Sequence, residues 1–228
     1  MLLEERVQQI QANIATACLR SQRVKSSVTL LAVSKTVGEV EVAQAMAAGL
    51  KDFGENKAQE LCRKAPAFPQ VRWHFIGNLQ SNKVKDVLPY VCCIHSLDRI
   101  SLAEEIQKRA GIRRISCLLE VNVAQEKSKA GLYLDEVLPF LKSLENYPAI
   151  VVHGLMTIAP MNPDSQSSRP VFRALRQKFE EIRDYQLPYA PVDTLSMGMT
   201  GDYMVAIEEG ATLVRIGTGI FGPRIYTK

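Results

Sequence analysis

Short apolar runs alternate along this chain with segments in which apolar residues recur every three or four positions. Continuous apolar runs are typical of buried strands, and the longer spacing is typical of helices with one buried face. The first such helical segment carries its apolar stripe at Leu3, Val7, Ile10, Ile14 and Cys18. It precedes the first strand-like run, so the pattern predicts an extra helix at the N-terminus.

The pattern as a whole predicts eight strands alternating with eight helices, joined by short connections. This alternation indicates a parallel sheet, and eight strands favour a closed (β/α)8 TIM barrel over an open sheet. No linker interrupts it, which predicts a single α/β domain over residues 1–228. The expected strands cover residues 28–33, 51–54, 71–76, 90–95, 115–123, 151–156, 194–197 and 213–216. After the first helix, the expected helices cover residues 39–48, 56–64, 80–88, 98–109, 134–144, a segment ending near 185, and 203–209.

Composition is that of an ordinary globular protein, with 46% hydrophobic and 23% charged residues. No apolar stretch approaches the roughly 20 residues that a membrane helix requires. The N-terminus brings acidic residues early and lacks the apolar core of a secretory signal. We therefore expect a cytoplasmic protein without a membrane partner.

The charge pattern argues against a nucleic-acid-binding protein, and the spacing of cysteines and histidines argues against a metal-binding one. The net charge is +4, but basic residues are interleaved with acidic ones, as in residues 178–183, so we expect no nucleic-acid partner. No Cys-x-x-Cys or His-x-x-x-His spacing occurs, and we predict no metal site. The five cysteines are Cys18, Cys62, Cys92, Cys93 and Cys117, and the three histidines are His74, His95 and His153.

One lysine, Lys35, closes the apolar run 30–34, where a strand would end and a helix begin. Partial desolvation there favours a neutral amine that can condense with a carbonyl, although a lysine that extends into solvent is the alternative. Near the other end of the chain, Arg215 closes an apolar strand and is followed by Gly217 and Gly219. A cation with a glycine-rich turn is typical of anion binding, although two glycines can also form a simple turn.

The barrel prediction brings these features together, because such barrels build their functional face at the carboxyl ends of the strands. The loops after the last two strands, residues 196–200 and 215–219, most often hold a phosphate in this fold. The sequence therefore predicts a reactive amine facing a phosphate site. Several other residues near strand ends could either contact a ligand or have a structural role. They are Asn56, His74, Asn78, Lys129, Ser196 and Thr200.

These residues lie in motifs that resemble the pyridoxal phosphate homeostasis protein family, the PLP-binding barrel proteins. The resemblance covers nearly the whole chain in order, and several motifs are long enough to be specific. The motifs are residues 32–36 (AVSKT), 53–57 (FGENK), 73–77 (WHFIG), 79–83 (LQSNK), 154–156 (GLM), 196–199 (SMGM), 214–217 (VRIG) and 220–222 (IFG). The resemblance implies the barrel of the alanine racemase N-terminal domain, PLP fold type III, with PLP held as an internal aldimine on Lys35.

The resemblance also implies roles for other residues. It places the phosphate contacts on Ser196, Gly198, Gly217 and Thr218, the arginine near the pyridine nitrogen on Arg215, and further pocket positions on Asn56 and His74. The chain departs from the family pattern at Val37, where many members carry a second lysine, and at Thr200, where many carry serine.

From this resemblance we expect a PLP carrier without catalytic residues, which buffers or delivers the cofactor and so influences amino-acid and keto-acid metabolism. Arginine cannot release its proton at accessible pH, so Arg215 would leave the pyridine nitrogen neutral and the ring a weak electron sink. The alanine racemases supply their second acid–base group from a C-terminal β-domain, which we do not expect in a chain ending at Lys228. We expect a monomer, with PLP-dependent apo-enzymes as recipients.

Two other classes stay open from the residues alone. An enzyme could be a PLP-dependent amino-acid racemase whose second base is Lys129 or His74, or a phosphosugar aldolase that uses Lys35. A regulatory partner protein would instead expose a binding surface, for which the helix bearing Arg169, Arg173 and Arg176 is the candidate. A PLP protein should be yellow, whereas the aldolase should be colourless.

Overall fold

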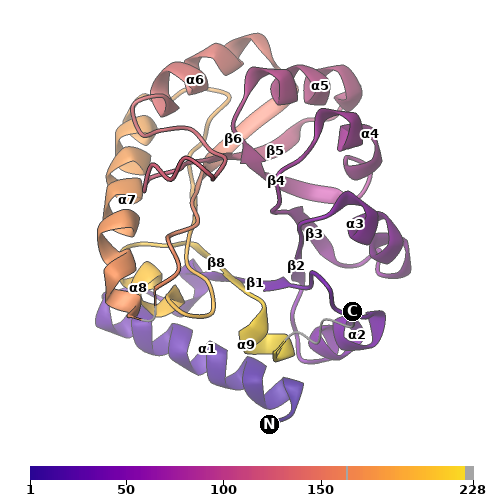
Figure 1. Ribbon diagram of the computed structural model, residues 1–228, viewed down its shortest axis with the longest axis vertical. Helices are drawn as coiled ribbons and strands as arrows, with labels where there is room; N and C mark the ends of the chain where they lie inside the picture. The colour runs from indigo at the N-terminus through magenta and orange to yellow at the C-terminus, as the bar shows by residue number, and fades with distance from the viewer. Residues whose placement is uncertain (163, 224–228) are drawn as a thin grey trace.

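The computed structural model describes residues 1–162 and 164–223, and in it eight parallel strands form a closed barrel. β1 pairs with β2 on one side and with β8 on the other, which closes the ring. Figure 1 looks along this ring and shows the helices outside it. The predicted (β/α)8 barrel is confirmed; residues 163 and 224–228 of the predicted domain lie outside the described residues. The strands are β1 (Thr29–Val33), β2 (Asp52–Glu55), β3 (Arg72–Phe75), β4 (Val91–Leu97), β5 (Ile115–Glu120), β6 (Ile150–Met156), β7 (Thr194–Ser196) and β8 (Leu213–Ile216).

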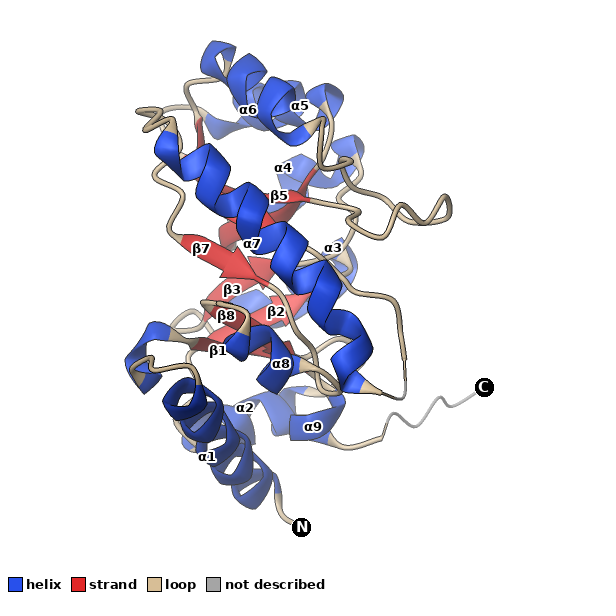
Figure 2. Cartoon of the chain, turned by 90° about the vertical axis from the view of Figure 1, so that its left-hand side faces the viewer, coloured by secondary structure: helices blue, strands red, loops and turns tan. Residues whose placement is uncertain are grey.

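The helices surround the ring, and Figure 2 shows the longest connecting helix, α7, lying across one wall of the barrel. The longer helices carry their buried apolar residues on one face, as the sequence spacing predicts. In the described part of the chain, no helix is both long and apolar enough to cross a membrane. The helices are α1 (Leu3–Arg20), α2 (Glu39–Ala47), α3 (Ala58–Lys64), α4 (Val84–Val87), α5 (Ile100–Ala110), α6 (Val137–Ser143), α7 (Arg169–Asp184), α8 (Tyr203–Glu208) and α9 (Thr218–Phe221).

The extra N-terminal helix, α1, packs against α8 and α9 beside the closing strands of the barrel. Its buried side chains include Val7, Ile10, Ile14 and Cys18, four of the five positions in the predicted stripe, while Leu3 is only half-buried. The helix therefore covers the elements that carry the glycine-rich turn after β8.

Three helices differ from the sequence expectation for local reasons. α6 begins at Val137 rather than at residue 134, so Pro139 stands in the first turn, where its missing N–H is not needed. The segment 80–88 forms a 3-10 turn, Ser81–Lys83, and then only the single turn of α4. α9 was not expected, because four residues are too few to show a helical period.

Polar side chains meet inside the ring. His95 lies on β4 and Ser196 on β7, which are not neighbouring strands, yet Nδ1 of His95 lies 3.3 Å from Oγ of Ser196. Such a contact can form only across the barrel interior. A small apolar cluster, Cys93, Leu118 and Met156, is separate from the main core between strands and helices. The interior is thus packed with mixed side chains, as expected for an eight-stranded barrel.

Candidate functional site

Lys35 and the turn after β8 lie in one pocket at the carboxyl ends of their strands. Lys35 follows β1 by two residues and is half-buried. Together with Gly217 and Thr218 it lines a pocket of about 220 Å³, whose other walls come from residues 36–38 and 221–223 and from Val33 and Glu41. Because β1 and β8 are hydrogen-bonded neighbours, their following loops must meet. The predicted juxtaposition of the amine and the glycine-rich turn is therefore confirmed.

Side chains from β2 and α3 hold the turn that carries Lys35. The Ser34 hydroxyl donates to Oε1 of Glu55 over 2.7 Å, and Nζ of Lys64 donates to both the Ser34 carbonyl and the same Glu55 oxygen, each over 2.7 Å. On the other side of Lys35, the Thr36 amide donates to Oε2 of Glu60 over 2.7 Å. The backbone on both sides of the amine is consequently fixed by charged side chains.

The loops after β7 and β8 bring polar groups together beside the same pocket. The hydroxyl of Thr200 accepts hydrogen bonds from the Gly219 amide and the Thr218 hydroxyl, both over 3.2 Å. Gly198 has a φ of +92°, and a Cβ there would lie 2.5 Å from that of Ala206, so only glycine fits. Hydroxyls and backbone amides in this arrangement suit an oxyanion such as phosphate.

Arg215 extends into the barrel interior and is almost completely buried. Its guanidinium donates to the Ser196 hydroxyl over 2.6 Å and to the Thr157 carbonyl over 2.7 Å. Burial lowers the pKa of Arg215 to about 10, an effect that the carboxylates of Glu120 and Asp202 oppose. Because this value is still above neutral pH, the side chain stays a cation, and its two hydrogen bonds fix its position.

Ser196, a predicted phosphate contact, lies inside the ring, and its contact with phosphate stays a prediction. Its hydroxyl is fully buried between Arg215 and His95, whereas the hydroxyl beside the glycine-rich turn belongs to Thr200. Ser196 is the last residue of β7 and points into the ring, while Thr200 belongs to the following loop. In the structure the Ser196 hydroxyl holds Arg215, whereas the Thr200 hydroxyl lies beside the glycine-rich turn.

Asn56 follows β2 directly, as predicted, and its carboxamide oxygen is buried. This oxygen has no hydrogen-bond partner among the described residues. The backbone carbonyl oxygen of Asn56 lies 2.2 Å from the position that a Cβ on Gly77 would take, so the loops after β2 and β3 are in contact. An acceptor without a donor at a strand end fits a contact to a ligand hydroxyl.

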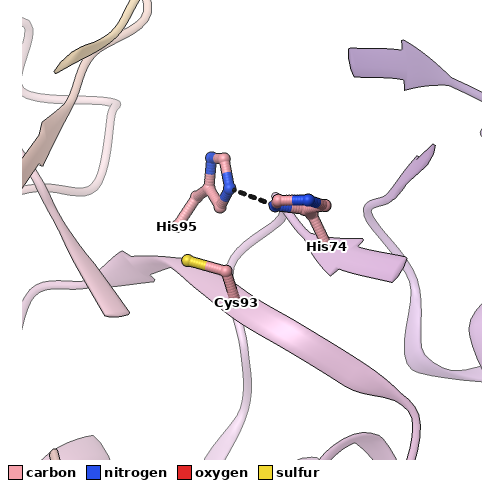
Figure 3. Close-up of side chains that lie close together, drawn as sticks. All are labelled: His74, Cys93 and His95. Atoms are coloured by element: carbon pink, nitrogen blue, oxygen red, sulfur yellow. Dashed lines mark hydrogen bonds between the residues drawn. The ribbon is translucent and has the colours of Figure 1, made fainter. Parts of the chain in front are cut away.

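His74 lies in a different pocket from Lys35. Its Nε2 is 3.2 Å from Oδ1 of Asp52 and its Nδ1 is 2.9 Å from Nε2 of His95. Figure 3 shows the two imidazoles edge to face, with Cys93 beneath them. The pocket they line has a volume of about 410 Å³, and its walls include the first residues of several strands, among them Thr29 and Asp52. His74 therefore faces the amino ends of the strands, contrary to the expectation from its motif.

The side chains proposed for the alternative classes have their own partners. Lys129, the possible second amine, pairs with Glu126 within the loop after β5. On α7, Arg169 pairs with Glu208 and Glu209, Arg173 with Glu209 and Arg176 with Glu180. These pairs give the α7 arginines a structural role on the barrel surface.

The sequence analysis missed Lys64, Glu60 and His95, which contact Ser34, Thr36 and Ser196 respectively. For Lys64 a signal existed: it lies three positions after Leu61, on the buried face of α3. His95 lies in the apolar strand β4, where every residue except Cys92 is buried, which shows that it is internal but not which side chain it meets.

We expect the free energy of unfolding to fall as the pH rises from about 6.5 to 9, because of His74. Burial lowers the pKa of His74, but the interactions with Asp52 and Cys92 together outweigh it and raise the pKa to about 9 from 6.5. A raised histidine pKa stabilises the folded state fully below the unfolded value and ceases to do so above the folded value, here at most about 3 kcal/mol. The pKa of Asp52 is lowered, so its contribution is complete above about 3.8 and is lost only as the pH falls through the lower pKa of the folded state.

Urea unfolding at about pH 6 and pH 9 measures this slope. The Asp52→Asn variant removes the carboxylate to which His74 is hydrogen-bonded. The loss of stability between the two pH values should therefore become smaller. An equal slope in both proteins would show that the hydrogen bond between His74 and Asp52 does not cause it.

The fold and the pocket define a barrel of the alanine racemase N-terminal type. The sequence profile of the family described as "Alanine racemase, N-terminal domain" matches residues 6–224, and the chain belongs to this family.

Relatives of full length narrow the assignment. The chain is 40% identical over 234 residues to a protein of Pasteurella multocida, covering all of both chains, and 44% identical over 229 residues to one of Aquifex aeolicus, covering 97% of this chain and 98% of the relative. Both are named pyridoxal phosphate homeostasis protein, and the chain belongs to that family. Among solved structures, PipY of Synechococcus elongatus, with PLP bound, superposes with a TM-score of 0.82 at 34% identity, covering 96% of this chain and all of PipY.

Proposed function

We propose that this chain binds PLP through a Schiff base on Lys35 and serves PLP homeostasis by holding the cofactor and releasing it to PLP-dependent apo-enzymes. The observation that carries the proposal is the shared pocket of Lys35, Gly217 and Thr218. The PLP-bound structure of PipY and the names of the full-length relatives support it.

The groups at the carboxyl ends of the strands match the chemical groups of PLP. The amides near Gly198, Gly217 and Gly219 and the hydroxyls of Thr200 and Thr218 are suited to the phosphate. The unpartnered oxygen of Asn56 would accept a hydrogen bond from a ring hydroxyl, and Arg215 would face the pyridine nitrogen. When bound, PLP supplies an aldehyde for the lysine and a ring that can accept electrons.

The proposal includes a non-catalytic role, and Arg215 supports it. A pKa of about 10 keeps the guanidinium protonated at neutral pH, so it donates a hydrogen bond but no proton. A pyridine nitrogen left neutral stabilises a carbanion poorly. The two candidate second bases are held by other groups, since Lys129 pairs with Glu126 and His74 with Asp52 and His95.

Borohydride reduction of the purified yellow protein tests the attachment. We expect the colour to be lost and peptide mass mapping to find pyridoxyl on Lys35. A colourless protein that becomes labelled only in the presence of a sugar phosphate would instead indicate an aldolase.

Hydrogen exchange tests the non-catalytic role. The holo-protein in deuterated water should leave the α-hydrogen of amino acids unexchanged. Exchange of any of them at the turnover rate of an enzyme would overturn this part of the proposal.

A further inference from the structure

The two residues beside Lys35 are held by a buried charged cluster of Glu55, Glu60 and Lys64. None of these three belongs to the described residues that line the Lys35 pocket. Lys64 and Glu55 have side chains with no exposed surface, and that of Glu60 is 18% exposed. The cluster therefore lies behind the pocket, between the barrel wall and α3.

Lys64 uses its full hydrogen-bonding capacity in this place. An ammonium offers three donors, and three acceptors surround it: the Ser34 carbonyl at 2.7 Å, Oε1 of Glu55 at 2.7 Å and Oε2 of Glu60 at 3.3 Å. One of the three is backbone, directly before Lys35. The charge of Lys64 is thus coupled to the position of the reactive turn.

Glu60 holds the other side. Its Oε2 accepts a hydrogen bond of 2.7 Å from the amide of Thr36, the residue directly after Lys35. Thr36 has a φ of +62°, a left-handed conformation that is unfavourable for a β-branched residue and persists only where the surroundings enforce it. The bond to Glu60 is a contact that enforces it, and the same carboxylate also reaches Lys64.

Stability alone does not account for such a cluster. Buried ion pairs are often no more stabilising than apolar residues of the same volume, because desolvation offsets the attraction between the charges. What they do provide is fixed geometry, since every donor and acceptor has a defined direction.

We propose that Glu60, Glu55 and Lys64 are positioning residues that hold the turn 34–36 so that Nζ of Lys35 meets the aldehyde carbon of PLP. This inference rests on the proposed function. In the condensation the lysine nitrogen forms a double bond to that carbon, and the aldehyde oxygen leaves as water. Misplacement of a reacting atom by about 1 Å slows such a step by up to about a hundredfold.

Glu60 offers the sharpest test because its side chain is partly exposed and can be replaced without leaving a buried charge alone. Glu60→Ala removes the acceptor of the Thr36 amide, whereas Glu60→Gln keeps an oxygen that can accept it. Gln59→Ala, an exposed neighbour on α3, is the control. The measurement is the rate at which the imine absorbance appears when PLP is mixed with the apo-protein, with the urea midpoint and the hydrogen exchange of the Thr36 amide recorded alongside.

We expect Glu60→Ala to form the imine about ten to a hundred times more slowly and to lose protection at Thr36, while Glu60→Gln and Gln59→Ala keep the wild-type rate. Equal rates in Glu60→Ala and wild type overturn the positioning role, whatever happens to the urea midpoint. A slow rate shared by Glu60→Ala and Glu60→Gln also overturns it. A wild-type chain that gains no pyridoxyl on Lys35 after reduction overturns the proposed function, and the positioning role with it.

Discussion

Replacing Lys35 with alanine is expected to abolish covalent attachment of PLP, because the imine needs a primary amine inside the pocket that also holds Gly217 and Thr218. Intact mass after borohydride reduction should show the pyridoxyl adduct in the wild type and none in Lys35→Ala. The phosphate contacts stay, so weak reversible binding should persist, with affinity reduced at least about tenfold, or 1.4 kcal/mol.

Lys129→Ala is the matched control, since Lys129 also lies in a loop after a barrel strand and its bond to Glu126 is local. This variant should keep the full adduct and the yellow colour. An adduct of normal yield on Lys35→Ala would show that another residue anchors the cofactor.

The position of Lys35 could be predicted because it depends on topology alone. Eight alternating units close into a ring, and closure makes β1 and β8 neighbours, so the residues after them must meet. Nothing about side-chain packing is needed for this step. The same reasoning brought the loops after β7 and β8 together, where Thr200 and Gly219 are hydrogen-bonded.

The depth of a side chain in the barrel could not be predicted. Sequence alternation tells which face a strand residue takes, but strand tilt and stagger decide whether it lies near the mouth or near the opposite end. β3 has only four residues, so a small shift in register decides the end that His74 faces. The depth of Ser196 could not be predicted for the same reason; its hydroxyl meets Arg215 and His95 inside the ring.

Spacing rules along the chain also missed contacts between side chains on neighbouring strands. His74 and His95 are 21 residues apart, yet their imidazole nitrogens lie 2.9 Å from each other. They come from the neighbouring strands β3 and β4, and register rather than local sequence brings them together. Lys64 was missed for a different reason, since lysine is among the residue types least often buried.

Replacing Lys64 with methionine is expected to lower the free energy of unfolding by about 3–5 kcal/mol, the range found when one partner of a buried ion pair is removed. Methionine fills similar space but carries no charge, so the Glu55 carboxylate stays buried with only the Ser34 hydroxyl as a donor. Its second oxygen, Oε2, already has no partner among the described residues. Urea unfolding at neutral pH measures the loss.

The double variant Lys64→Met/Glu55→Gln separates the unpaired charge from lost packing. A neutral amide is less costly to bury than a carboxylate, so the double variant should recover part of the loss, and the recovered amount is the coupling between the two sites. Lys108→Met, at an exposed position on α5, should change stability by no more than about 0.5 kcal/mol. If Lys64→Met lowered the free energy of unfolding no more than Lys108→Met does, the ion pair of Lys64 and Glu55 could not be holding the turn at Lys35. Removing a cation that holds the turn should destabilise the folded state.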